Sequence, residues 1–417
     1  MIIYKFFKNK IGVSYVSTGL FFTAATMLSG FIILRWLDPT SLGKWQSFLV
    51  FIGYLQILSL GSTSGLNREL AYLIGKGQLA IGLNKLSTVG YYITFTSFTL
   101  VIVFFLISII GFLLGGLSLE TSIMFFFAFG NSAIKFQENF LSSTYRSSSS
   151  FLDISKIQIV LIILLFILLP LVYFFKLYGL IAYQTIISIV SYLMFFFHRP
   201  YKVKYSFDKN VFLSVVRIGF PMYIWNFLIS VSRSLPRLVL VLFGSPYLVG
   251  LYSPAGSLNT ALLALPNYVT RFIFPKMSFK FGKSNDKREI FHYTMISIGK
   301  LFPFMLAIVL ILSFIIPFFI NYFVPKYSES ILSCQFILFS GLFYGFNNIM
   351  HSGVNSLLLF KGLRIIVFFR YAFFIVFIYI SSLFFENLVN AVAFGSILAE
   401  LFNFFLYYRY FRKVSLS

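Results

Sequence analysis

Charged residues are scarce in this sequence, and their scarcity excludes an ordinary soluble protein. Of the 417 residues, 59% are hydrophobic and only 11% are charged. Soluble globular domains carry about 25% charged residues. The mean hydropathy is +0.91, and no soluble core would hide so much apolar surface. The composition therefore predicts an all-α integral membrane protein, because helices satisfy their own backbone groups in lipid.

Cysteine and histidine are also rare, which restricts the chemistry available to the chain. The single cysteine, Cys334, excludes an internal disulfide and a cysteine-based metal cluster. The histidines His198, His292 and His351 show no spacing typical of metal ligands. The sequence has no glycine-rich phosphate loop and no nucleophile motif. We therefore expect no metal, no cofactor and no enzymatic activity, ATP hydrolysis included.

Long apolar runs fill most of the chain. A helix that spans a bilayer needs about 20 mostly apolar residues. Twelve segments meet this requirement: 12–35, 45–66, 87–117, 119–143, 154–175, 178–198, 214–243, 248–273, 294–323, 329–359, 364–384 and 388–408. Because twelve is even, both termini are expected on the same side of the membrane.

Basic residues far outnumber acidic ones, 33 to 11, and give a net charge of +22. On the twelve-span topology, 27 of the 33 lie on one side and four on the other. Positively charged loops face the cytoplasm, so both termini are expected in the cytoplasm. The charge then reflects topology, and nucleic acid is not an expected partner. The basic stretch 276–288, beside the membrane, is expected to attract anionic lipid headgroups.

A short internal repeat divides the chain in two. Gly43 and Trp45, after the first span, match Gly250 and Tyr252, after the seventh, with an offset of 207 residues. Six spans per half give both halves the same orientation, with a repeat axis along the membrane normal. We therefore expect two six-helix bundles around a central cavity. The expected parts are one bundle at 1–198, a cytoplasmic linker at 199–213 and a second bundle at 214–417.

A polar stripe inside the seventh span marks the expected substrate site. Arg233 and Arg237 lie on one helix face, which Asn226 and Ser230 extend. A charge near the bilayer centre costs roughly 3 kcal/mol or more, so it is kept for a cavity, a partner or a ligand. Arg233 lies roughly 15 Å from the helix end near Phe243, too far to snorkel to the interface. Arg237 is nearer that end, so an interfacial anchor and a functional role both stay open.

Four further charged residues are candidates with two interpretations each. Arg35 ends the first span, either as an outer interfacial anchor or at the level of the site. Lys135 and Glu138 are three residues apart and either neutralise one another or leave Lys135 lining the inward mouth. Glu400 is the only acidic residue deep in the last three spans. It is a candidate for ion or proton coupling, and the alternative is a hydrogen bond to a neighbouring helix.

Several short motifs carry a family resemblance. They are 34–39 followed by Gly43, 217–221, Arg237 with the hairpin 250–253, 275–278 and 316–328. With the length and the two halves, they resemble the Wzx-type O-antigen and capsule flippases. These are polysaccharide transporters of the multidrug/oligosaccharidyl-lipid/polysaccharide exporter superfamily. One departure is that Pro236 precedes Arg237, where the family often has an acidic residue.

The resemblance implies a substrate, a mechanism and a location. Such proteins flip undecaprenyl-pyrophosphate-linked oligosaccharide across the bacterial cytoplasmic membrane by alternating access, in O-antigen, lipopolysaccharide or capsule biosynthesis. The implied partners are this lipid, membrane lipids and other polysaccharide assembly proteins. A diphosphate cannot cross about 30 Å of hydrocarbon unaided, and arginine offers it two parallel hydrogen bonds.

Two other functions compete with flipping. An ion-coupled exporter of the related multidrug type that takes cationic drugs should have acidic residues in its cavity, whereas this stripe is basic. A polymerase or ligase of lipid-linked sugars typically needs a sizeable outer loop, whereas every outer loop here is short. Both comparisons favour the flippase.

Overall fold

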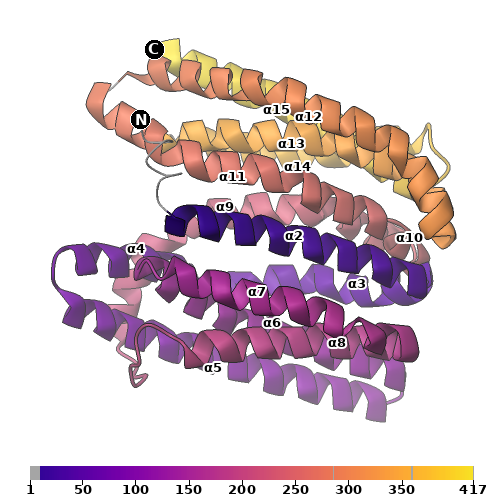
Figure 1. Ribbon diagram of the computed structural model, residues 1–417, viewed down its shortest axis with the longest axis horizontal. Helices are drawn as coiled ribbons and strands as arrows, with labels where there is room; N and C mark the ends of the chain where they lie inside the picture. Colours follow the sequence, from indigo (N-terminus) through magenta and orange to yellow (C-terminus); the bar gives the residue numbers. More distant parts are fainter. Residues whose placement is uncertain (1–9, 285, 358–359, 417) are drawn as a thin grey trace. The chain divides into compact units, whose positions relative to one another are not determined.

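The computed structural model describes residues 10–284, 286–357 and 360–416, and every regular element in these ranges is a helix (Figure 1). The order is α2 (Lys10–Trp36), α3 (Pro39–Leu55), η1 (Gln56–Ser59), α4 (Ser62–Gly75), α5 (Leu79–Leu113), α6 (Leu119–Ser147), α7 (Phe151–Ile167), α8 (Leu169–Phe197), α9 (Lys209–Phe243), α10 (Pro246–Leu251), α11 (Ser253–Ser284), α12 (Lys287–Phe323), η2 (Pro325–Ser330), α13 (Ile331–Ser356), α14 (Phe360–Ser382) and α15 (Leu388–Leu416).

These helices make the chain a multi-pass membrane protein. Within the described ranges, nine are long and apolar enough to cross a membrane, or ten if a bent pair counts as one span. Each of the twelve expected spans overlaps a described helix, so the all-α class is confirmed. The last two positions of the expected span 329–359 lie outside the described residues, as do Lys5 and Lys8.

Three expected spans are broken rather than straight. The expected span 45–66 bends by 50° between η1 and α4. Leu60 and Gly61 have φ values of 50° and 70° there, and the left-handed conformation ends one helix before the next begins. The expected span 248–273 is divided into α10 and α11, and the expected span 154–175 is divided between α7 and α8. The apolar periodicity predicts the helices but not these interruptions.

The described chain packs into two compact units. Unit 1 comprises residues 10–29 and 45–231, and unit 2 comprises residues 30–44 and 232–416. All three boundaries of this division fall inside helices: α2 and α9 each begin in unit 1 and end in unit 2, and α3 begins in unit 2 and ends in unit 1. The expected domain limits, with a linker at 199–213, stay a prediction.

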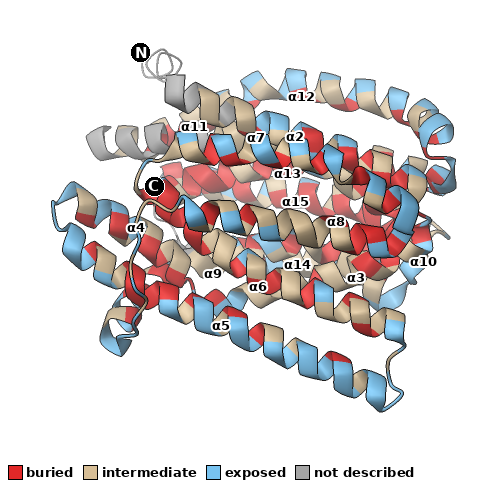
Figure 2. Cartoon of the chain, turned by 60° about the horizontal axis from the view of Figure 1, so that its bottom comes forward, coloured by how far each residue is buried: buried red, intermediate tan, exposed pale blue. Residues whose placement is uncertain are grey.

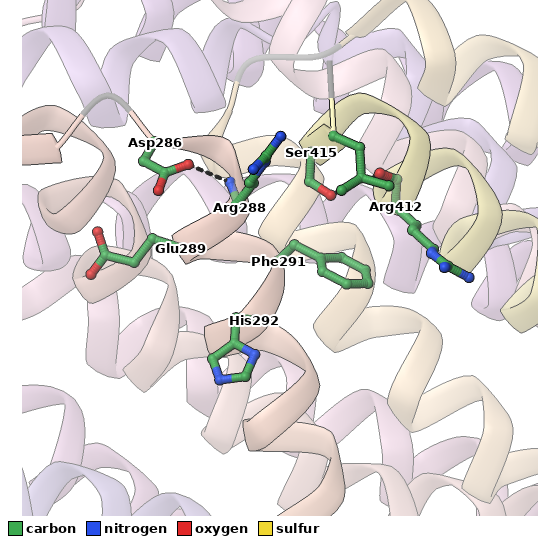
Figure 3. Close-up of a pocket in the computed structure, with 8 residues that line it drawn as sticks. Asp286, Arg288, Glu289, Phe291, His292, Arg412 and Ser415 are labelled. Atoms are coloured by element: carbon green, nitrogen blue, oxygen red, sulfur yellow. Dashed lines mark hydrogen bonds between the residues drawn. The ribbon is translucent and has the colours of Figure 1, made fainter.

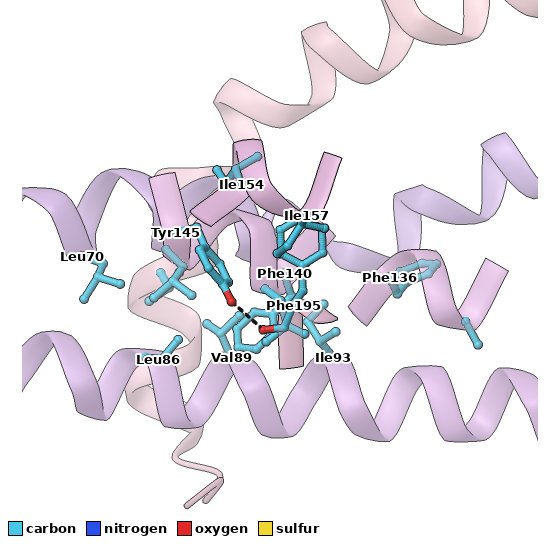
Figure 4. Close-up of a cluster of buried hydrophobic side chains, with 14 of the residues drawn as sticks. Leu70, Leu86, Val89, Ile93, Phe136, Phe140, Tyr145, Ile154, Ile157 and Phe195 are labelled. Carbon is cyan, nitrogen blue, oxygen red and sulfur yellow. Dashed lines mark hydrogen bonds between the residues drawn. The ribbon is translucent and has the colours of Figure 1, made fainter. Parts of the chain in front are cut away.

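The core of unit 1 is apolar and aromatic (Figure 4). Phe136, Phe140 and Tyr145 of α6 pack with Ile93 of α5 and Phe195 of α8, and all five side chains are buried. The one polar group that this cluster must satisfy is the Tyr145 hydroxyl, which donates to the Phe195 carbonyl at 2.9 Å. Such a cluster holds three long helices together without charge.

In unit 2, the two copies of the internal repeat lie directly against each other. A Cβ atom at Gly43 would overlap the carbonyl oxygen of Pro246, and one at Gly250 would overlap the carbonyl oxygen of Pro39. Each glycine therefore meets the proline four residues before the other glycine. Only a residue without a side chain lets the two backbones come this close.

Unit 1 contains a comparable approach of two backbones. A Cβ atom at Gly219 of α9 would overlap the carbonyl oxygen of Gly61, and one at Gly65 would overlap the carbonyl oxygen of Val215. The start of α9 is thus fixed against the start of α4. Gly219 belongs to the 217–221 motif, so that motif has a packing role here.

Many helix surfaces leave large apolar side chains uncovered. Figure 2 shows α5 with long stretches of exposed residues between buried ones. Phe95, Phe98 and Leu106 on this helix are 60%, 66% and 49% exposed. A soluble protein rarely exposes so much contiguous apolar surface, whereas the hydrocarbon of a bilayer accepts it. The exposed face of α5 is therefore a lipid-facing surface.

Candidate functional site

Arg233 is held by an aromatic side chain of a neighbouring helix. It lies on α9 in unit 2, and its Nε atom donates a hydrogen bond to the hydroxyl of Tyr344 on α13. Its guanidinium carbon is 4.8 Å from the centroid of the Tyr344 ring, within the range of a cation–π contact. The residue is otherwise exposed. Among the described residues, no carboxylate pairs with it.

A second arginine lies over the same ring. The guanidinium carbon of Arg370, on α14, is 4.9 Å from the centroid of Tyr344. Unlike Arg233, Arg370 is buried, and its Nη2 atom forms an ion pair with Oε1 of Glu400 on α15. The ring of Tyr344 thus contacts one guanidinium that is neutralised and another that is not.

The carboxylate of Glu400 is satisfied on both oxygens. Oε2 accepts a hydrogen bond of 2.7 Å from Nδ2 of Asn347, and the same nitrogen donates to the Glu400 carbonyl at 3.0 Å. The hydrogen bond to a neighbouring helix, one of the two interpretations of Glu400, is therefore present. Coupling through Glu400 stays a prediction, now with the added fact that Arg370 is its ion-pair partner.

Arg370 is one of the 27 basic residues that the twelve-span topology places on the cytoplasmic side, and this placement is wrong. The residue lies inside the membrane-spanning part of α14, between Gly362 and Ser382, and only 6% of it is exposed. Removing it from the loop count leaves a strong asymmetry. The signal that it was misplaced was available in the sequence, because the expected span 364–384 already contained it. Nothing in the sequence singled out Tyr344 among 26 tyrosines.

Polar groups continue through the interior of unit 2. His351, one turn after Asn347 on α13, has its Nδ1 atom 3.2 Å from the Tyr407 hydroxyl and its Nε2 atom 2.8 Å from Nδ2 of Asn355. Asn403 on α15 is buried, and neither polar atom of its side chain has a partner among the described residues. Buried amides of this kind usually bind water.

Arg237 is half-buried and differs from Arg233 in its surroundings. Its guanidinium carbon lies 6.0 Å from the centroid of the Tyr252 ring, and its Nε atom has no partner in the described structure. A Cβ atom at Gly256 of α11 would come within 2.6 Å of Nη2, so this glycine makes room for the guanidinium. Among the residues that the structure describes, no carboxylate forms an ion pair with Arg237 in place of the acidic residue that Pro236 replaces.

The other predicted site residues are not brought into one cluster. Asn226 and Ser230 are exposed but belong to unit 1, so the structure describes the two parts of the stripe separately. Arg35 is exposed in the last turn of α2. Lys135 and Glu138 form an ion pair of 3.0 Å, as one of their two interpretations expects, and a place for Lys135 at the inward mouth stays a prediction.

An open pocket of about 550 Å³ lies where α12 begins and α15 ends (Figure 3). Arg288 and His292 of α12 and Arg412 of α15 line it, with two carboxylates on the α12 side. No sequence pattern predicted it, beyond the basic stretch that contains Arg288. In the described ranges, no three side chains of histidine, cysteine, aspartate or glutamate are grouped to hold a metal ion.

Comparisons with known proteins identify the fold. No protein-family model matches the sequence, and no curated protein sequence does. An inward-facing multidrug-resistance MATE transporter of the MOP superfamily has 14% identity and a TM-score of 0.71, covering 95% of this chain and 96% of its own. The lipid II flippase MurJ in its inward closed conformation has 17% identity and a TM-score of 0.70, covering 97% of this chain and 90% of its own.

A third similar structure is described by the polarity of its pocket. It is a MOP superfamily transporter from Pyrococcus furiosus for which a reversed polarity of the binding pocket suggests a different function. Its identity is 15% and its TM-score 0.59, with 96% of this chain and 95% of that chain covered. At such identities the likeness establishes that this chain has the MOP transporter fold, and it leaves the substrate open.

Proposed function

We propose that this protein flips a lipid-linked oligosaccharide, carried on undecaprenyl pyrophosphate, across the bacterial cytoplasmic membrane by alternating access. The MOP fold supports transport, and one protein with this fold, MurJ, is a lipid II flippase. Within the fold, the residues of unit 2 favour an anionic headgroup. Both termini would then lie in the cytoplasm, and the route served would be O-antigen, lipopolysaccharide or capsule assembly, together with other assembly proteins.

The observation that carries this proposal is the guanidinium of Arg233. It is exposed on a membrane-spanning helix, is held on Tyr344, and has no carboxylate partner among the described residues. A guanidinium in this state can donate a bidentate pair of hydrogen bonds to a phosphate. Because Tyr344 fixes its orientation beforehand, less side-chain entropy is lost when the phosphate arrives.

The balance of charge in unit 2 argues against a site for cationic drugs. Glu400 is the one acidic residue deep in the last three spans, and Arg370 neutralises it. Within the membrane-spanning part of α9, Arg233 and Arg237 have no carboxylate partner among the described residues. We assign Arg233 the principal contact with the diphosphate, with Arg237, Asn226, Ser230, Arg35 and Lys135 as further candidates along the path.

Genetic complementation tests the function. Deletion of the gene should make lipid-linked repeat units accumulate on the inner leaflet and remove surface polysaccharide. Normal surface polysaccharide in the deletion strain, with no second flippase present, would refute the proposal. The wild-type gene should restore export, and Arg364→Gln, a change of an exposed arginine outside the stripe, should restore it equally.

Substitutions at Arg233 test the assignment of the site. A charge-assisted hydrogen bond is worth about 1.5–3 kcal/mol, so Arg233→Ala should reduce binding of undecaprenyl pyrophosphate roughly 10- to 100-fold. Arg233→Lys keeps the charge but loses the planar fork, so it should be impaired to a lesser degree. Binding of undecaprenol, which lacks the diphosphate, should not change in either variant. If both variants bind and export like wild type at equal protein level, Arg233 is a structural residue.

A further inference from the structure

The pocket between the start of α12 and the end of α15 is lined by basic and by apolar side chains (Figure 3). Arg288 and Arg412 contribute guanidinium groups, one from each helix. Phe291 and Leu416 supply the apolar lining of the pocket. The ring of Phe291 packs 5.2 Å from that of Phe411 and 5.9 Å from that of Tyr408. A site of this kind suits a ligand that is charged at one end and apolar at the other.

The two carboxylates of the pocket already have partners. Oδ1 of Asp286 accepts a hydrogen bond of 2.8 Å from the backbone N–H of Arg288 and so caps α12. Oε1 of Glu289 lies 2.8 Å from Nζ of Lys280, in an ion pair. Neither Arg288 nor Arg412 has a carboxylate partner among the described residues. The pocket therefore offers two unpaired guanidinium groups to an anion.

The position of the pocket relative to the membrane indicates which kind of anion it binds. It lies at the ends of Lys287–Phe323 and Leu388–Leu416, both long and apolar enough to span. At about 1.5 Å a residue, Arg288 lies about 9 Å before the expected span 294–323 and Arg412 about 6 Å after the expected span 388–408, which places both at the level of the headgroups. Leu416, which lines the pocket together with the two arginines, is 58% exposed and adds an apolar side chain to it. A free phosphate would use the arginines but not the apolar surface.

We propose that this pocket is a binding site for an anionic phospholipid, with Arg288 and Arg412 contacting the headgroup phosphate from two helices. A lipid bound there would tie the start of α12 to the end of α15. The site is separate from Arg233 and Tyr344, so it does not depend on the proposed transport activity. Its effect is to stabilise unit 2 in proportion to the anionic lipid in the leaflet.

Native mass spectrometry of the full-length protein tests the proposal, with titration of phosphatidylglycerol, phosphatidylcholine and inorganic phosphate. Wild type should retain phosphatidylglycerol at least tenfold more tightly than phosphatidylcholine. The paired change Arg288→Gln with Arg412→Gln should remove that preference. The matched control is Arg409→Gln with Lys413→Gln, which takes two exposed charges from the same helix end without touching the pocket. It should keep most of the preference.

Three results would overturn the site. Equal retention of the two lipids by wild type would show that the site does not distinguish an anionic headgroup from a zwitterionic one. Equal loss in the two paired variants would show that general attraction between basic residues and the leaflet explains the binding. Displacement of phosphatidylglycerol by inorganic phosphate at a similar concentration would show that the ligand is a free anion. The first and third results need no variant, so they hold even if a substitution prevents folding.

Discussion

Unit 1 and unit 2 differ in how deeply they bury charged side chains. In the described part of unit 1, the ion pairs Lys85–Glu69, Lys135–Glu138 and Lys156–Asp153 each keep at least 15% of both side chains exposed, and the core around Phe140 is apolar. In unit 2, the side chains of Arg370 and Glu400 are only 6% and 10% exposed. The same fold thus contains one half held together by packing and another with charge inside.

The difference shows that the free-energy cost of burying charged side chains falls on unit 2. A buried ion pair often adds no net stability, because the desolvation of both charges offsets their attraction. In a membrane, ionisable groups inside the bundle are costly and usually functional. Arg370, the ion-pair partner of Glu400, contacts the ring of Tyr344, which also holds Arg233, so the buried charge is linked to the proposed substrate contact through one side chain. Unit 1 contains no proposed principal substrate contact, and its described interior holds no buried ion pair of this kind.

Breaking the buried pair should produce the largest effect. Glu400→Gln leaves Arg370 charged and without its partner, and the loss should be about 3–5 kcal/mol of folding free energy. In unit 1, Glu138→Gln removes the partner of Lys135, whose side chain is 53% exposed, and should cost about 0–1 kcal/mol. Thermal unfolding of the purified variants measures both. Similar small losses would mean that the pair in unit 2 is no more important than one at the surface.

The close approach of the repeat copies should produce the next effect. Gly43→Ala places a methyl group against the backbone of Pro246 and should destabilise by about 1–3 kcal/mol. Gly53→Ala is the control, because a Cβ at Gly53 meets nothing within 4 Å and alanine favours a helix by roughly 0.5–1 kcal/mol. Unfolding midpoints should therefore move in opposite directions. A Gly43→Ala protein as stable as wild type would show that the two helices separate at little cost.

A pair of tyrosine substitutions separates function from stability. Tyr344→Phe removes the acceptor for Arg233 but keeps the ring, so binding of undecaprenyl pyrophosphate should weaken about fivefold, equivalent to about 1 kcal/mol. Tyr145→Phe in unit 1 removes a buried hydrogen bond to Phe195 and should lower stability by about 1 kcal/mol while leaving binding intact. If both variants change stability alone, Tyr344 does not position Arg233.

The smallest effect concerns helix starts. Burial would raise the pKa of the Asp38 carboxyl, but hydrogen bonds from Ser41 at the start of α3 outweigh burial and hold the pKa below its ordinary value. The stability from this contact is complete above the unfolded pKa of about 3.9 and is lost as pH falls through the lower folded pKa. In unit 1, the start of α6 uses Ser118, which does not titrate.

Replacement of Asp38 by serine tests this contrast. Asp38→Ser keeps a capping oxygen and removes the titration, so its difference from wild type should be about 0.5–1 kcal/mol at most. Wild type should lose stability relative to Asp38→Ser between pH 5 and pH 3, measured by thermal unfolding at each pH. A constant difference across that range would show that the carboxylate adds nothing that a hydroxyl lacks.

The sequence predicted the helices and the contacts between residues of one helix, but it did not predict contacts between residues of two different helices. Apolar runs located the helices, and a spacing of three predicted the pair of Lys135 and Glu138. The repeat pointed to Gly43, though not to its contact with Pro246. Arg370 and Glu400 are 30 positions apart on α14 and α15, and their pairing depends on how those helices pack. Hydropathy carries no information about which helix faces meet, so Tyr344 was not identified.

The division of α2 and α9 between the units has a consequence for synthesis in the cell. Residues 30–44 emerge from the ribosome about 200 residues before the segment of α10 against which Gly43 packs. During membrane insertion, residues 30–44 therefore lack their contact with α10 while the rest of unit 1 is synthesised. Truncated nascent chains would leave this segment accessible to quality-control proteases until α10 has entered the membrane. Unit 2 thus contains one segment, residues 30–44, that is synthesised long before the rest of the unit.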